Sequence, residues 1–261
     1  MELNLNTKTA HPSKHLPHDG SAFPVASTLF EERLVEERLP FTVKIVRSDA
    51  ELEKAVHIRH AAYDRHLPEL AALLENAEAM DHQPGSIVLL AESQLDGTPV
   101  GTMRIQTNRY NQLALEKSVD LPEWLNGTSQ AEATRLGVIN QRVGRLVKIA
   151  LFKAYFQYCQ LDEIDWMVIA ARSPLDRTYV NLLFTDVIPN GEFIPMRHAA
   201  NVPHRVLAFN IDRAESLWRE NHHPLYDFVF KTHHPDINLT GVDYLPLTRQ
   251  SNSPLFRPMH N

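Results

Sequence analysis

The fold class follows from the stretch EATRLGVINQRVGR, residues 132–145, which joins a strand, a loop and the start of a helix. Glu132–Ile139 is predicted to be a strand, and Gly144 opens a long helix that is predicted to reach about Tyr158. Between them, the loop Gln141–Arg145 carries one glycine and two arginines. Backbone N–H groups at the start of a helix can bind phosphate oxygens. The stretch therefore predicts a strand–loop–helix unit that can bind an anion.

Strand and helix patterns alternate on both sides of this unit. Apolar and polar residues alternate over Phe41–Val46, which predicts a strand, and Ser48 with Glu51 has the spacing of a helix capping box. Further strands are predicted at Ser86–Ala91, Val100–Gln106, Ile164–Ala171, Glu192–Met196 and Arg205–Ile211, and helices from Ser48 to about Tyr63 and near Arg213–Asn221. This order predicts an α/β domain of three layers, with a central mixed sheet and helices on both faces.

One domain is predicted over residues 39–244, between two less regular ends. Residues 1–38 mix prolines and histidines with few aromatic residues, and we expect a flexible arm. Within it, residues 29–38 (LFEERLVEER) have the pattern of a short exposed helix. Residues 245–261 are rich in proline, serine and asparagine, and we expect a flexible tail there. No Gly/Ser linker or internal repeat interrupts the middle region, so one core is expected.

The composition excludes several classes of protein. The chain has 26 basic and 32 acidic residues and a net charge of −6, which argues against a nucleic-acid binder. No apolar run reaches the roughly 18 residues of a membrane span, and the first residues lack the pattern of a secretory signal. A single cysteine, Cys159, cannot form an internal disulfide. A reducing, cytoplasmic location is therefore expected.

The fourteen histidines raise the question of a metal site. Two pairs are adjacent, His222-His223 and His233-His234, and adjacent histidines rarely bind the same ion. The H-E-x-x-H pattern of a zinc protease does not occur in the sequence. The sequence therefore predicts no metal centre.

Arginines occupy positions where a charge needs a partner. Arg59 lies on the apolar face of the helix predicted after Ser48, and Arg104 lies in a predicted central strand. An unpaired buried charge is very costly, so each arginine needs a carboxylate nearby. The candidates form one cluster: Arg59, Asp81, Arg104, Glu132 and Arg135. Such a cluster fits either a functional site or a structural ion-pair network.

Glu132 and Arg135 pose a problem of geometry within this cluster. Strict alternation along a strand puts residues three apart on opposite faces. A β-bulge, or a strand that begins later, is needed to bring these two side chains together.

Several motifs follow one another along the chain in a definite order. They are Arg59-x-x-x-Tyr63, Glu78-x-x-Asp81, Val100-Gly-Thr-Met-Arg104 and Glu132-x-Thr-Arg135-Leu-x-Val138. Together they resemble the acyl-homoserine-lactone synthases and, more closely, the FeeM-like N-acyl amino acid synthases, both of the GNAT-like acyltransferase superfamily. Two later segments, Ser173–Phe184 and His223–Tyr226, also resemble this group. The resemblance spans roughly residues 42–232.

The resemblance implies a GNAT-like fold whose twisted central sheet opens into a V-shaped cleft. It implies transfer of a long-chain fatty acyl group from acyl carrier protein, or less often from coenzyme A, to the α-amine of an amino acid. Acyl-phosphopantetheine would then be a co-substrate, and no tightly bound cofactor is expected. Its arm would lie in the cleft against Leu136 and Val138, and Gln141, Gly144 and Arg145 would hold its phosphate. Acyl carrier protein and the amino acid would be the partners.

The same resemblance implies roles for the charged cluster. Arg59, Tyr63, Asp81 and Arg104 would bind substrate, and Glu132 and Arg135 would be catalytic. An amine must lose a proton in its attack on a thioester, and Glu132 is the candidate base. Backbone N–H groups near Leu136–Val138 would stabilise the oxyanion, and Arg135 or Arg104 would hold the carboxylate of the acceptor.

The chain also departs from the lactone synthases. No tryptophan lies between Tyr63 and Asp81, Glu78 stands where an aspartate is usual, and the phosphate loop has one glycine where two are usual. These departures favour the FeeM-like branch. Two alternatives stay open: a lactone synthase that uses S-adenosylmethionine, and a catalytically silent acyl-binding module on the same fold.

Overall fold

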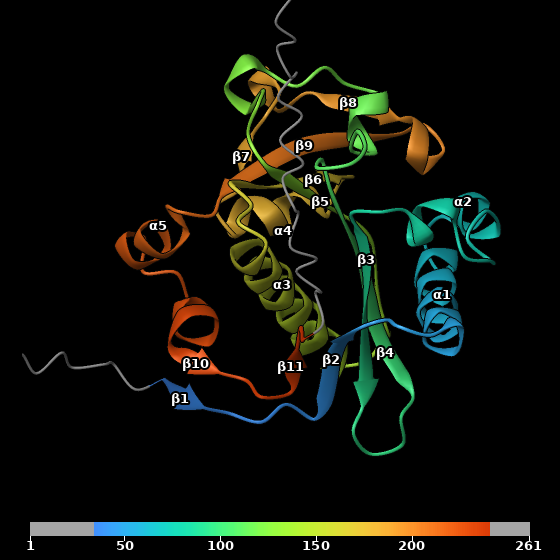
Figure 1. Ribbon diagram of the computed structural model, residues 1–261. Coiled ribbons are helices and arrows are strands. Elements are labelled where there is room, and N and C mark those ends of the chain that lie inside the picture. Colours follow the sequence, from blue (N-terminus) through green and yellow to red (C-terminus); the bar gives the residue numbers. More distant parts are fainter. Residues whose placement is uncertain (1–33, 241–261) are drawn as a thin grey trace, which may run out of the picture. The chain divides into compact units, whose positions relative to one another are not determined.

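A computed structural model describes residues 34–240 of the chain (Figure 1). The strands are β1 (Val35–Glu36), β2 (Phe41–Ile45), β3 (Ser86–Ser93), β4 (Pro99–Thr107), β5 (Gln130–Val138), β6 (Trp166–Ala171), β7 (Thr185–Asp186), β8 (Phe193–Met196), β9 (Val202–Asn210), β10 (Thr232–His233) and β11 (Ile237–Asn238). The helices are α1 (Asp49–Asp64), α2 (Pro68–Ala72), α3 (Val143–Leu161), α4 (Asp176–Asn181) and α5 (Ala214–Glu220). The predicted tail 245–261 lies outside the described residues.

The main sheet is mixed and has the strand order β11-β2-β3-β4-β5-β6-β9-β7, with β8 paired to β9. The neighbours from β2 to β5 run antiparallel, β5 and β6 run parallel, and β6 and β9 run antiparallel again. The parallel pair in the centre of the sheet, β5 and β6, is joined by the long helix α3, because parallel strands need a long crossover connection. The predicted mixed sheet is confirmed.

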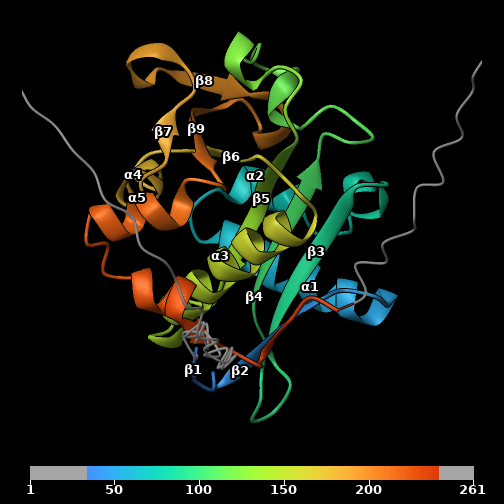
Figure 2. The same cartoon turned by 60° about the vertical axis from the view of Figure 1, so that its left-hand side comes forward.

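Helices cover both faces of the sheet, as the sequence predicts. Figure 1 shows α1 and α2 on one side of the β3–β4 hairpin and α3 on the other, and Figure 2 shows α3 lying across the sheet. On the α1 side, Leu52 and Val56 belong to the same buried cluster as Val88 and Leu90. On the α3 side, the larger core includes Met103, Ile105, Val147, Leu151 and Tyr155. Burial of these two apolar faces holds the three layers together.

The two edges of β5 differ, and this difference creates the site. Towards β4 the whole strand is paired, with one irregularity, because Thr102 lies opposite Gly137 while Arg104 lies opposite Thr134. Two residues of β5 therefore face one residue of β4, which is a β-bulge. Towards β6 only Gln130–Ala133 is paired. Beyond Ala133 the two strands separate, and the sheet opens there.

The predicted strands are confirmed with ends that shift by at most three residues. Ser48 caps α1, and its side chain accepts a hydrogen bond from the Glu51 N–H. The Glu51 carboxylate accepts from the N–H of Arg47, so the capping box is displaced by one residue. The predicted helix over residues 29–38 is wrong in its described part, because Val35–Glu36 forms β1 and pairs with β10. That partner is distant in sequence, so no local pattern reveals it.

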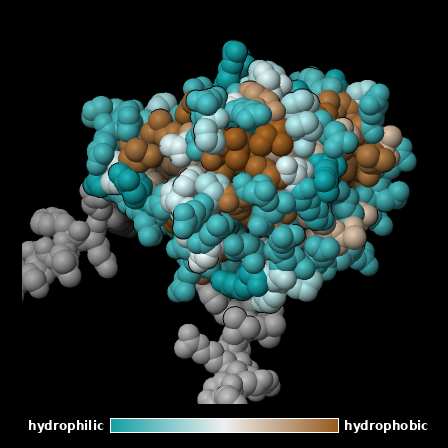
Figure 3. All heavy atoms as spheres, turned by 90° about the horizontal axis from the view of Figure 1, so that it is seen from above, coloured by the Kyte–Doolittle hydropathy of each residue, from teal (hydrophilic) through white to brown (hydrophobic). Residues whose placement is uncertain are grey.

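The surface and the helices carry two further observations. Figure 3 looks down on the end of the domain that holds β7, β8 and β9, and it shows apolar side chains gathered in patches among polar ones. Among residues 34–240, no helix has the length and the apolar character needed to cross a membrane. The cytoplasmic location stays a prediction, and so do the limits of the predicted arm and domain.

Candidate functional site

Three buried arginines and two carboxylates form an ion-pair cluster between α1 and the sheet. Arg59 of α1 donates two hydrogen bonds of 2.9 Å to Asp81, and Arg104 of β4 donates to Glu78 at 3.0 Å and to Asp81 at 3.2 Å. Arg135 of β5 donates from Nε and Nη2 to the two oxygens of Glu78, both at 2.7 Å. Arg59 and Arg104 have no exposed surface at all. The predicted convergence of these arginines with Asp81 is thus observed, and Glu78 joins it.

The cluster carries more positive than negative charge. Burial tends to raise the pKa of Glu78 and of Asp81, but hydrogen bonds and charge from the arginines lower both pKa values below the usual range. Both carboxylates are therefore ionised at neutral pH. Two negative charges face three guanidiniums, so the cluster retains one positive charge, which favours an anion beside it.

The bulge in β5 explains how Arg135 reaches this cluster. Arg135 has a positive φ of 57°, in the left-handed region that residues other than glycine rarely adopt. This conformation breaks the alternation of the strand and turns the guanidinium towards Glu78 on the α1 side. A bulge, one of the two arrangements that could bring Glu132 and Arg135 to one face, is present at this position.

Glu132 does not join the cluster. One of its oxygens accepts from the N–H of Leu115 at 3.2 Å and a further hydrogen bond comes from the backbone of Ala114, while Oε1 is buried with no partner in the described chain. Burial raises its pKa from 4.5 to about 7. Its side chain lies in the interior and does not line any of the three cavities described below. Glu132 thus makes no direct ion pair with Arg104 or Arg135, although the charges of both arginines act on it and tend to lower its pKa. Its predicted role as a base stays a prediction.

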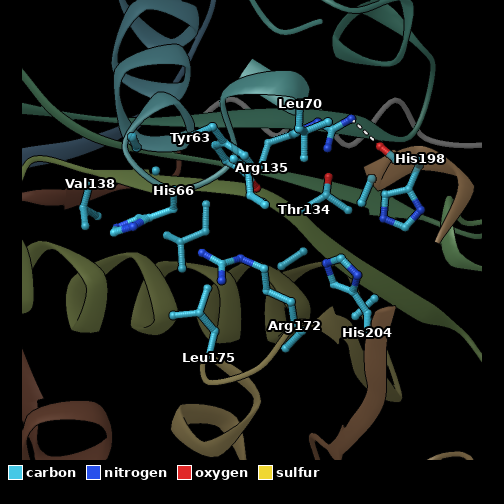
Figure 4. Close-up of a pocket in the computed structure, with 18 of the residues that line it drawn as sticks. Tyr63, His66, Leu70, Thr134, Arg135, Val138, Arg172, Leu175, His198 and His204 are labelled. Carbon is cyan, nitrogen blue, oxygen red and sulfur yellow. Dashed lines mark hydrogen bonds between the residues drawn. The ribbon is translucent and has the colours of Figure 1, made fainter. Parts of the chain in front are cut away.

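A first cavity, of about 240 Å³, lies where β5 and β6 separate (Figure 4). Its charged and ring-bearing lining residues are Tyr63, Arg65, His66, Arg135, Lys148, Arg172, Tyr179, His198 and His204. We call it the cationic cavity, because these arginines and Lys148 line it and its lining within residues 34–240 includes neither aspartate nor glutamate. In the view of Figure 4, His198 and His204 stand at one end of the cavity and His66 and Val138 at the other.

A second cavity, of about 660 Å³, lies on the α3 side of the sheet. We call it the apolar cavity. Its lining is mostly apolar and aromatic: Met103, Ala133, Leu136, Ile149, Phe152, Tyr155, Leu175, Tyr179, Leu182, Pro224 and Leu225. Five residues line both the cationic cavity and the apolar cavity: Ala133, Leu136, Lys148, Leu175 and Tyr179. The two cavities therefore meet at the opening of the sheet. The volume of the apolar cavity lies in the range of small-molecule binding sites.

A third cavity, of about 620 Å³, surrounds the loop between β5 and α3. It brings together the predicted phosphate-binding residues Gln141, Gly144 and Arg145, with Arg142 and Lys148. A Cβ atom on residue 144 would lie 2.3 Å from the carbonyl oxygen of Ile139, so only glycine fits this turn. No side chain caps the start of α3, and its first turn has no acidic residue. The local charge favours an anion.

Backbone groups of β5 face the opening between the cavities. Ile139 donates its N–H to the carbonyl of Val100 on β4, whereas the carbonyl of Val138 accepts from the side chain of Arg65. Polar groups of successive residues point to opposite edges of a strand. The N–H groups of Val138 and Leu136 therefore turn towards the unpaired edge, where the sequence predicts donors for an oxyanion.

Sequence reasoning missed three residues of the cationic cavity. Arg172 follows the last residue of β6, and its Nη1 donates to the carbonyl of Ser173 at 3.2 Å. His198 and His204 come from the turn before β9 and from β9 itself. A basic residue directly after a buried strand could have indicated Arg172. No local pattern distinguishes these two histidines from the other twelve.

Two predicted substrate contacts need correction. Arg104 is fully buried, lines none of the three cavities and is occupied by Glu78, Asp81 and Thr134, so it cannot grip a substrate carboxylate. Arg135 lines the cationic cavity, but its Nε and Nη2 already form the fork with Glu78. Tyr63, in contrast, lines the cationic cavity, and its predicted contact with substrate stays a prediction. In the part of the chain that the structure describes, no group of three or more histidine, cysteine or acidic side chains could hold a metal ion.

Comparison with protein-family models and with curated proteins gave no match. Among solved structures, the chain is similar to FeeM, an N-acyl amino acid synthase from uncultured soil microbes, with 16% identity and a TM-score of 0.55 over 69% of this chain and 96% of FeeM. It is also similar to BjaI, a CoA-dependent acyl-homoserine lactone synthase, with 16% identity and a TM-score of 0.50 over 76% of this chain and 95% of BjaI. The resemblance that the motifs predict is confirmed at the level of the fold, and the chain has the fold of the GNAT-like acyltransferases.

Proposed function

We propose that this protein is an N-acyltransferase that moves a long-chain fatty acyl group from acyl carrier protein, or from acyl-CoA, to the α-amine of an amino acid. One observation carries the proposal: an apolar cavity and a cationic cavity meet where β5 and β6 separate. An acyl chain needs the first, and an anionic acceptor needs the second. FeeM, which has a similar fold, is an N-acyl amino acid synthase.

The donor fits the opening of the sheet. The acyl chain would occupy the apolar cavity, and the phosphopantetheine arm would run along the unpaired edge of β5. Its phosphate would sit at the loop with Gln141, Gly144 and Arg145. The N–H groups of Leu136 and Val138 would then hold the thioester oxygen and stabilise the tetrahedral oxyanion.

The charge of the cationic cavity favours an acceptor with a carboxylate. Arg65, Arg135, Lys148 and Arg172 line it, and no acidic residue from the described ranges does. S-adenosylmethionine carries a positive sulfonium, which this lining repels. The lactone-synthase alternative is therefore disfavoured. Arg172 is our candidate for the carboxylate anchor, because among residues 34–240 its guanidinium makes a single hydrogen bond, from Nη1 to the carbonyl of Ser173.

The surface beside the phosphate loop favours acyl carrier protein as the donor. Acyl carrier proteins are acidic, and this chain has a net charge of −6, so docking needs a local basic patch. Arg142 and Arg145 are exposed there, and Lys148 is half-buried one turn further along α3. In this proposal Arg59, Asp81 and Arg104 position the wall of the cavity and do not contact substrate.

A single incubation distinguishes the three possible functions. The full chain would be mixed with myristoyl acyl carrier protein or myristoyl-CoA, a pool of L-amino acids and S-adenosylmethionine, and the products analysed by mass spectrometry. We expect an N-myristoyl amino acid. An acyl-homoserine lactone would establish the lactone synthase in its place. Binding of the acyl donor without any product would establish a silent acyl-binding module.

A further inference from the structure

The apolar cavity has one end at the opening of the sheet and extends away from it. The residues that it shares with the cationic cavity, among them Lys148 and Leu175, mark the end where the thioester would lie. From Lys148 the lining continues along α3 through Phe152 to Tyr155, which lies about 10 Å further along the helix axis. An acyl chain that starts at the opening therefore extends towards lining residues that belong to the apolar cavity alone.

Two segments outside the sheet form the outer wall of this part of the cavity. Asn181 and Leu182 come from the end of α4, and residues 223–225 follow α5. Figure 1 shows α4 and α5 on the same side of the β3–β4 hairpin as α3. Asn181 and Pro224 are exposed, so both segments reach the protein surface. What holds these two segments together therefore decides how far the cavity is closed.

The ring of His223 ties the two segments to each other. Its Nδ1 accepts a hydrogen bond from the N–H of Leu225 at 3.2 Å, and its Nε2 lies 3.0 Å from the carbonyl oxygen of Asn181. Since Nδ1 is the acceptor, the hydrogen of the neutral ring is on Nε2 and is donated to Asn181. Burial lowers the pKa of His223, which keeps the ring neutral. Both nitrogens of the ring are thus used to join α4 to the segment after α5.

The indole of Trp218 supports the same wall from behind. Trp218 is fully buried, and its Nε1–H donates to the carbonyl of Leu182 at 3.0 Å. Its ring stacks on His223, with the ring centroids 3.8 Å apart, and on Phe152, with the centroids 5.8 Å apart. We call His223 and Trp218 the clasp. Every ring nitrogen of the clasp has a hydrogen-bond partner, so the wall that it holds is not free to move outwards.

We propose that the clasp sets the longest acyl chain that the apolar cavity accepts, with His223 as the specificity-determining residue. This inference rests on the proposed function, because it requires that the acyl chain occupies this cavity. A chain that fits gains burial against the apolar lining with each methylene. A longer chain meets the outer wall and has to break the hydrogen bond between His223 and Asn181, or bend back on itself.

The test compares acyl chains of increasing even length on acyl carrier protein, with the amino acid that gives most product in the incubation above. In His223→Asn, the shorter side chain can still accept from the N–H two residues on, but it cannot reach Asn181. We expect the ratio of kcat/KM for the first acyl chain that is too long over the best one to rise at least about tenfold, because one methylene in a pocket is worth 10–200-fold. A merely structural role would lower kcat/KM equally for all lengths.

Three further variants sharpen the test. His223→Gln places an amide N–H near the position of Nε2, so it should keep the tie to Asn181 and restore the original length limit. Leu225→Phe keeps the backbone N–H and adds volume to the lining, so it should move the preference to shorter acyl chains. His222→Asn is the matched control: this neighbouring histidine is exposed and has a φ of 48°, which asparagine adopts readily. It should leave the length limit unchanged.

The outcomes separate this inference from the proposed function. If the unaltered protein transfers acyl groups and a folded His223→Asn keeps the same length limit, the inference is wrong while the proposed function stands. If His223→Asn does not fold, Leu225→Phe decides, and an unchanged length preference there overturns the inference.

If the unaltered protein transfers no acyl group, the proposed function fails. The same length series is then measured as binding of acyl-CoA by isothermal titration calorimetry. His223→Asn should extend the range of acyl chains that bind. An unchanged range, or no binding of any acyl-CoA, would overturn the inference as well.

Discussion

Arg135 belongs to both the ion-pair cluster and the lining of the cationic cavity, and these two regions differ in how far their charged groups have partners within the protein. In the cluster, Arg59 and Arg104 are wholly buried, and both form ion pairs with Glu78 and Asp81. In the cavity, the guanidinium of Arg172 makes one hydrogen bond within the described residues, to the carbonyl of Ser173. The charges of the first region are paired, although Nε of Arg59 has no hydrogen-bond partner, and the charges of the second are mostly unpaired. A paired cluster stabilises a wall, whereas an unpaired lining is free to bind, so the two regions should respond differently to substitution.

The largest effect is expected in the cluster. Glu78 accepts hydrogen bonds from Arg59, Arg104 and Arg135, so Glu78→Gln leaves buried positive charge without a partner. The free energy of unfolding should fall by about 3–5 kcal/mol, measured by urea denaturation. Glu75→Gln, at an exposed neighbouring position, should change it by less than about 0.5 kcal/mol. Equal decreases in the free energy of unfolding in both variants would contradict the stabilising role of the ion-pair cluster.

Glu132 should give the next largest effect, seen in the pH dependence of stability. Its folded pKa of about 7 lies above its usual 4.5, so its contribution is fully present below pH 4.5 and is lost as the pH rises through 7. The loss amounts to roughly 3 kcal/mol at 1.36 kcal/mol per pH unit. Unfolding curves at pH 5 and pH 8 should show it in the unaltered chain. Glu132→Gln cannot ionise, and its curves should lack this decrease.

On the cavity side, Arg172→Gln should act on binding and leave stability nearly unchanged. A charged hydrogen bond to a carboxylate contributes about 1.5–3 kcal/mol, so the KM of the amino acid should rise about 10- to 100-fold. Steady-state kinetics with varied amino acid measures this change. Arg219→Gln on the exposed face of α5 serves as the matched control. A normal KM in Arg172→Gln would remove this residue from the acceptor site.

The smallest effect is expected on the docking surface outside the cavity. Arg145→Glu reverses one exposed charge beside the phosphate loop, so the KM of acyl carrier protein should rise by about three- to tenfold at low salt. The difference should shrink as ionic strength rises, because salt screens exposed charges. Lys117→Glu, exposed on a different segment, should leave the KM near its starting value. An unchanged KM in Arg145→Glu would move the docking surface elsewhere.

Short sequence patterns predict much of the fold, because the strands and helix caps they indicate depend on residues that are close together in the chain. The alternation in Phe41–Val46 and the cap at Ser48 both depend on neighbours within a few residues, and both are confirmed within a residue or so. The pairing of β1 with β10 depends on a strand almost two hundred residues away, so the pattern at 29–38 indicated a helix instead. Distance along the chain separates what the sequence predicts from what it misses.

The site divides in the same way. The need of buried Arg59 and Arg104 for carboxylates is a matter of charge, and the sequence predicts their cluster with Asp81 correctly. Glu132 accepts hydrogen bonds from the backbone of Ala114 and Leu115. Every residue except proline carries a backbone N–H, so the residue types at these positions do not indicate this contact.

The half-paired strand β5 gives the sheet an edge in its interior. Edge strands invite pairing with another extended chain, and proteins normally place them at the rim. Here the unpaired edge from Thr134 to Val138 lies inside the sheet and lines the cationic cavity. A pantetheine arm is extended and carries its own amides, and it would serve as the missing segment of strand. Under the proposed function, its binding would complete the pairing of β5, so the donor would stabilise the folded chain. Saturation at 100 times the Kd would add about 2.7 kcal/mol to the free energy of unfolding.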